Sequence, residues 1–101
     1  MPIAKVKDWE LNVKANAEFV KKGIDTQHLK VSSTSGLVHV SGKIVFTGTK
    51  VDASVDAEVI GALKNVDRMI RIINGVKDVK YALSNWQKIG GNWNRKTKEA
   101  Q

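Results

Sequence analysis

The clearest hydrophobic pattern along the chain lies between Val55 and Ile73. Apolar residues recur there every three or four positions, which is the spacing of one face of an α-helix. Asp56 and Glu58 suit the first turns of such a helix, and Asn74-Gly75 suits a left-handed cap at its end. We expect this helix to form the backbone of the core through Val55, Val59, Ala62, Leu63, Val66, Met69, Ile70 and Ile73.

A second helix is predicted nearer the start of the chain, from Asp8 to Gly23. The carboxylate of Asp8 can accept from the free N–H groups of a first turn, and Gly23 tolerates the left-handed turn that ends a helix. Two stripes compete for its buried side. The first stripe consists of Trp9, Val13, Ala17 and Val20, whereas the second consists of Leu11, Ala15 and Phe19 and would leave Trp9 at an edge.

Alternating apolar and polar residues predict three strands. Residues 29–32 and 37–46 alternate on either side of a turn at 33–36, where Gly36 supplies the positive φ of a tight hairpin. Gly42 lies on the inner side of the return strand, which indicates a bulge or close packing. The third strand is predicted by Val79, Tyr81 and Leu83.

The predicted order is therefore helix, strand, strand, helix, strand. This order indicates an α+β fold of αββαβ type, with two helices packed on one face of a three-stranded sheet. After Trp86 the periodicity stops, and residues 87–101 contain Gly90-Gly91 and several basic residues. We expect a domain over residues 1–86 and a basic flexible tail over 87–101, with Trp86 in the core and Trp93 on the surface.

Length and composition narrow the function. A chain of 101 residues with 42% hydrophobic residues forms one domain with shallow pockets. It has no cysteine, which excludes disulfides, thiolate nucleophiles and cysteine–zinc sites. The first residues include charges and no long apolar run, so they predict neither signal peptide nor membrane anchor, and we expect a cytoplasmic protein without a transmembrane segment.

Two segments resemble the BON domain, a bacterial module of osmotically induced and nodulation proteins. They are "LKVSSTSGLVHVSGKI" at 29–44 and "IRIINGVKDVKYAL" at 70–83. Gly36, Ser41-Gly42, Gly75-Val76 and Val79 match its pattern, and the element order matches over residues 8–84. The Gly42 to Gly75 interval is longer than in the family, and we expect neither the signal peptide nor the second copy that family members commonly have. The resemblance implies a non-enzymatic module that binds phospholipid or other partners and, in some fusions, a small ion.

Candidate catalytic chemistry is sparse. The two histidines, His28 and His39, fall on neighbouring strands without an acidic residue at motif spacing, so solvent-facing positions are favoured over a metal pair or a base. The "IGGNWNRK" segment does not open a helix after a strand and therefore lacks the context of a phosphate loop. We expect no enzymatic activity, cofactor or metal site.

The positive features are basic. The net charge of +7 favours polyanions as partners, although it also serves solubility. Lys64, Arg68 and Arg71 form a ridge opposite the apolar stripe of their helix, which is either a solvated face or a binding face. The tail adds tryptophan beside cations, a combination that suits anionic lipid or single-stranded nucleic acid. The predicted anionic-ligand site consists of Lys64, Arg68, Arg71, Lys88, Trp93, Arg95, Lys96 and Lys98.

The leading hypothesis is an anionic phospholipid surface as the partner. An acidic protein partner would meet the same charges. Nucleic acid is the alternative from another class, and a protein-interaction or self-assembly domain that forms an oligomer through an exposed sheet edge or face is the third.

Overall fold

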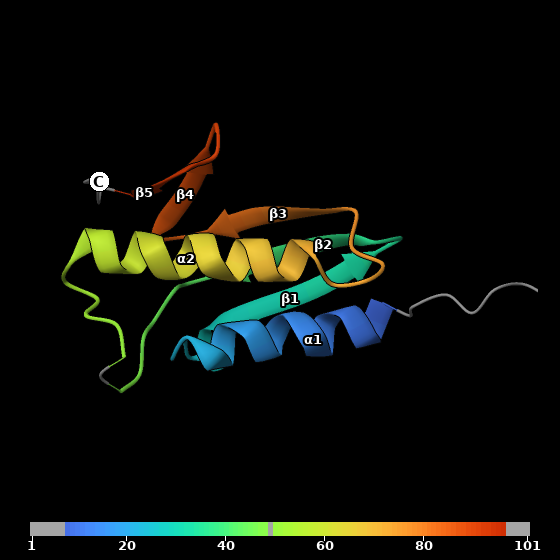
Figure 1. The fold of residues 1–101 in the computed structure, drawn as a ribbon, viewed down its shortest axis with the longest axis horizontal. Helices are drawn as coiled ribbons and strands as arrows, with labels where there is room; N and C mark the ends of the chain where they lie inside the picture. Colours follow the sequence, from blue (N-terminus) through green and yellow to red (C-terminus); the bar gives the residue numbers. More distant parts are fainter. Residues whose placement is uncertain (1–7, 49, 97–101) are drawn as a thin grey trace, which may run out of the picture.

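The protein forms a three-stranded sheet with two helices on one face and a short hairpin at the end (Figure 1). The computed structural model describes residues 8–48 and 50–96. Its elements are α1 (Asp8–Lys21), η1 (Thr26–His28), β1 (Leu29–Thr34), β2 (Leu37–Gly42), α2 (Asp56–Arg71), β3 (Asp78–Leu83), β4 (Trp86–Ile89) and β5 (Asn92–Arg95). The predicted α+β fold is confirmed.

The sheet has the order β1-β2-β3 and is mixed. β1 and β2 are antiparallel, whereas β2 and β3 are parallel. A parallel pair requires a crossover connection, and α2 supplies it. In Figure 1 α1 and α2 run in opposite directions, and the two helices contact each other.

Burial on the strands shows which face the helices cover. Val38 and Val40 of β2 and Val79 and Leu83 of β3 are buried, and most of their neighbours on the opposite face are polar. The open face carries Lys30, Ser32, His39, Ser41 and Lys80, at positions that alternate with the buried ones. Because only one face is buried, both helices pack on that face.

α1 faces the sheet with the second of its two candidate stripes. Leu11, Ala15 and Phe19 are at most 1% exposed, whereas Trp9 and Val13 are 62% and 59% exposed. A hydrogen bond of 2.6 Å from the Ser33 hydroxyl of β1 to the Asn12 side-chain oxygen is consistent with this rotation of the helix. The stripe that begins at Trp9 therefore lies in solvent.

The strand β2 ends at Gly42, four residues earlier than the alternation predicts. Gly42 has a φ of +112°, and a Cβ there would collide with the carbonyl oxygen of His28. The glycine thus permits close approach to the start of β1, and its left-handed backbone turns the chain out of the sheet. Phe46 instead forms an isolated bridge with Ile24.

The prediction of a flexible tail is wrong for residues 87–95. β4 and β5 pair as an antiparallel hairpin, with positive φ at both Gly90 and Gly91 in its two-residue turn. Trp86 is 2% exposed, as predicted, but Trp93 is 3% exposed and not on the surface. The indole of Trp93 packs edge-on against the Tyr81 ring at a centroid distance of 4.7 Å. The hairpin is therefore part of the core, while residues 97–101 lie outside the described residues.

Candidate functional site

The basic residues of the hairpin region form hydrogen bonds and ion pairs with other parts of the protein. Lys88 Nζ lies 3.0 Å from Asp67 Oδ2, and Lys96 Nζ donates to the Leu83 carbonyl at 2.7 Å. Arg95 Nε donates to Asp56 Oδ1 at 2.8 Å, and its guanidinium lies 4.6 Å from the centroid of the Trp86 ring. These contacts fasten the hairpin to α2 and β3.

Asp67 on α2 is the centre of a polar network under this hairpin. Its carboxylate accepts from Tyr81 Oη at 2.7 Å, from Arg71 Nε at 2.9 Å and from Lys88 Nζ at 3.0 Å. Burial of Asp67 opposes its charge, but these hydrogen bonds outweigh the burial and lower the pKa of the carboxyl. Burial and the Asp67 carboxylate raise the pKa of Tyr81. The network is a structural link between three elements.

Arg71 belongs to the same network. Besides Asp67, its guanidinium donates to Asp78 Oδ1 at 2.7 Å. The hydrogen bond to Asp67 raises the pKa of Arg71, which keeps its charge. The members of the predicted site that are engaged within the fold are therefore Arg71, Lys88, Trp93, Arg95 and Lys96. Lys98 lies outside the described residues.

Lys64 and Arg68 are the members of the predicted site that remain free. Both are exposed on α2, one turn apart, on the side opposite its buried residues. Among the described residues neither side chain has an ion-pair partner. Their charges are therefore available to an external anion.

The outer side of α1 adds an apolar row that the predicted site omitted. Trp9 is 62%, Val13 59% and Val20 57% exposed, and Ala17 between them is also exposed. These residues recur at i, i+4, i+8 and i+11, which places them on one side of the helix, away from the sheet. Single exposed apolar residues are ordinary, but a row over three turns forms a patch. The sequence contained the signal, since α1 has two apolar stripes and only one can face the sheet.

The two helices present these features on one surface. Both cover the same face of the sheet, so their outer sides point in the same direction (Figure 1). We call this surface the helix face and define it by Trp9, Val13, Ala17 and Val20 of α1 together with Lys64 and Arg68 of α2. It combines an apolar row with a pair of free cations.

The remaining candidate chemistry is not assembled into a site. His39 is exposed on the open face of the sheet, and His28 Nε2 lies 3.7 Å from Asp25 Oδ2 at the end of η1. Over residues 8–48 and 50–96 no group of three or more His, Cys, Asp or Glu side chains could hold a metal ion. In the same part of the chain no helix has the length and apolar character needed to cross a bilayer.

The chain matches no model of a known protein family, no curated protein and no solved structure. The BON-like pattern at residues 29–44 and 70–83 thus stays a resemblance.

Proposed function

We propose that the protein is a non-enzymatic module that binds an anionic phospholipid surface through its helix face. The observation that supports this function is the exposed apolar row of α1 beside the unpaired Lys64 and Arg68 of α2. The resemblance to the BON domain favours the same class of function. The binding surface differs from the ridge and tail expected from the sequence, because most of those cations are paired within the fold.

Two contributions to the binding free energy add together on the helix face, one electrostatic and one apolar. Each lysine or arginine held near an anionic bilayer contributes about 1 kcal/mol, and the interaction weakens with salt. An apolar helix side with tryptophan inserts shallowly at the boundary between head groups and acyl chains. Neither term gives stable binding alone, whereas the helix face supplies both on one side of the molecule.

The helix face is less suitable for binding nucleic acid. Sequence-tolerant binding of single strands uses several aromatic side chains along a basic groove. On the helix face Trp9 is the one aromatic residue, and the open face of the sheet bears lysine, serine and histidine instead. Salt-dependent binding to DNA or RNA in the absence of vesicle binding would favour that alternative.

Co-sedimentation with vesicles tests the proposal. Wild-type protein is mixed with phosphatidylcholine vesicles that contain increasing fractions of phosphatidylglycerol, at low and high salt. We expect binding that rises with the anionic fraction and falls with salt. Binding that is independent of both would contradict the proposal.

Matched variants locate the surface. Lys64→Glu with Arg68→Glu removes two cations, and we expect binding to weaken roughly 30-fold or more. Lys30→Glu with Lys80→Glu makes the same change of charge on the open face of the sheet and should preserve more of the affinity. Val13→Ser with Val20→Ser should weaken binding on the order of tenfold without a change of charge. Equal losses in both charge variants would indicate a net-charge effect and refute the assignment to the helix face.

A further inference from the structure

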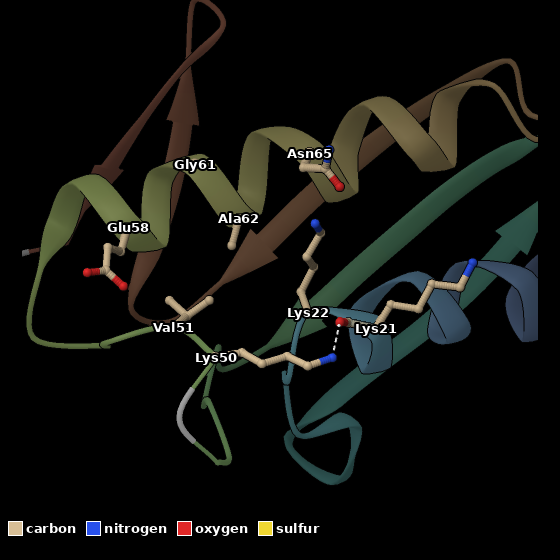
Figure 2. A pocket seen from close by; sticks show the side chains of 8 residues that line it. All are labelled: Lys21, Lys22, Lys50, Val51, Glu58, Gly61, Ala62 and Asn65. Atoms are coloured by element: carbon tan, nitrogen blue, oxygen red, sulfur yellow. Dashed lines mark hydrogen bonds between the residues drawn. The ribbon is translucent and has the colours of Figure 1, made fainter.

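A cleft beside the helix face has the features of an anion site. It lies between the end of α1, the segment at residues 50–51 and the first half of α2, and its volume is about 550 Å³ (Figure 2). Lys21, Lys22, Lys50 and Asn65 line it together with Glu58 and Gly61. This volume is within the range of pockets that hold small molecules.

Two polar side chains face each other across the cleft. In Figure 2 Lys22 extends from the end of α1 toward Asn65 on α2. Neither the Lys22 ammonium nor the Asn65 amide has a hydrogen-bond partner among the described residues. Both side chains are half-buried. Their donors are therefore free to bind an acceptor placed between them.

Lys50 offsets the partial negative charge at the end of α1, which would otherwise repel an anion in the cleft. The carbonyl groups at the end of a helix carry partial negative charge. Here the ammonium of Lys50 donates to the carbonyl oxygen of Lys21 at 3.0 Å, so a positive charge covers that end of α1 (Figure 2). Lys21 itself turns away and pairs with Glu18 at 3.2 Å.

Glu58, the acidic residue that lines the cleft, is hydrogen-bonded at the edge of the cleft. Glu58 Oε1 accepts from the backbone N–H of Asp52 at 3.0 Å, and Figure 2 shows this side chain at the far end from Lys22. A second depression shares Gly61 and Asn65 with the cleft and is also lined by Lys64 and Arg68. Outside the backbone of its own helix, a Cβ at Gly61 would meet no atom within 4 Å, so no side chain covers α2 at this position. Cations thus outnumber carboxylates along the whole cleft.

We propose that this cleft binds a phosphomonoester, with Lys22 and Asn65 as the contacting donors and Lys50 as a neighbouring charge. A phosphomonoester carries a charge of about −1.5 to −2 at neutral pH and offers several acceptor oxygens, which suits two donors on opposite walls. The space beyond a single phosphate leaves room for a small polar carrier. The same group occurs on soluble phosphorylated metabolites and on lipid head groups such as phosphatidic acid. This inference is independent of bilayer binding by the helix face.

The soluble arm of the test uses glycerol 3-phosphate, followed by amide NMR shifts, with glycerol as the control. We expect saturable shifts at Lys22, Gly61 and Asn65. Lys22→Gln should weaken the binding about tenfold, as expected for one charge-assisted hydrogen bond, and Asn65→Ala should weaken it less. Lys30→Gln, which removes the same charge from the open face of the sheet, should change it less than twofold. An unchanged thermal midpoint in each variant shows that the fold is kept.

The lipid arm compares vesicles of phosphatidic acid with vesicles of phosphatidylglycerol at matched surface charge. A preference for phosphatidic acid that Lys22→Gln abolishes and Lys30→Gln keeps assigns the group to a lipid. Saturable shifts with glycerol 3-phosphate but no such preference assign it to a soluble metabolite. The absence of both, or equal losses in the two glutamine variants, overturns the inference. Shifts at Lys22 and Asn65 without any vesicle binding would refute the proposed membrane function and leave the cleft assignment intact.

Discussion

Replacement of Trp93 by alanine tests whether the β4–β5 hairpin is part of the core or only a flexible tail. Trp93 is 3% exposed, and its ring packs edge-on against Tyr81. Truncation of a buried tryptophan to alanine costs about 3–5 kcal/mol. The value here should fall at the low end, because Trp93 Nε1 is buried without a hydrogen-bond partner among the described residues and its removal relieves that cost.

A loss of about 3 kcal/mol corresponds to a decrease of roughly 12–24 °C in the melting temperature of a domain of this size. Thermal unfolding followed by circular dichroism measures it. Trp93→Phe keeps most of the ring and deletes the unpaired N–H, so it should restore most of the stability. Trp9→Ala, at an exposed position, should change the free energy of unfolding by no more than about 0.5 kcal/mol. A Trp93→Ala protein that melts within 3 °C of wild type, with ~4–8 °C expected per kcal/mol, would refute the packing of the hairpin.

The polar network gives a pH prediction. The pKa of Asp67 is lowered in the folded state, so its contribution to stability is present above the unfolded pKa of about 3.9 and is lost as pH falls through the folded value. Asp67→Asn should therefore lower stability at pH 7 and flatten the acid dependence in urea unfolding from pH 6 to pH 2; an unchanged dependence would count against the network. Gly42→Ala should destabilise by more than about 1 kcal/mol, because alanine meets both a positive φ and the His28 carbonyl. Gly48→Ala, at a positive φ with no atom nearby, is the control and should cost less in the same unfolding assay.

The parts of the fold that could be predicted are those with long or regular patterns. α2 was readable because its apolar stripe extends over four turns and just one side of it can be buried, and Val59, Leu63, Val66 and Ile70 are buried as expected. The strands around Gly36 could be predicted because their apolar and polar residues alternate regularly and one face of the sheet is buried. α1 was ambiguous, since both of its stripes satisfy the helical period and tertiary packing chooses between them.

The hairpin could not be read from periodicity, because each of its strands has four residues and each buries one tryptophan. Its usable signal was Gly90-Gly91, a pair that favours a two-residue turn between strands. The predicted site failed for a related reason. Lys88 pairs with Asp67, 21 positions away, and Arg95 with Asp56, 39 positions away, and the sequence does not show such contacts. Lys64 and Arg68 stayed exposed because they lie opposite the apolar stripe of α2.

The fluorescence of Trp9 reports whether the helix face lies on an anionic bilayer. The other two tryptophans are 2% and 3% exposed, so a lipid-borne quencher should reach Trp9 preferentially. With vesicles of brominated phosphatidylglycerol we expect a blue shift and quenching in the wild type, and loss of that quenched component in Trp9→Phe. Vesicle-bound protein whose fluorescence is not quenched, or is quenched equally in Trp9→Phe, would contradict binding through the helix face.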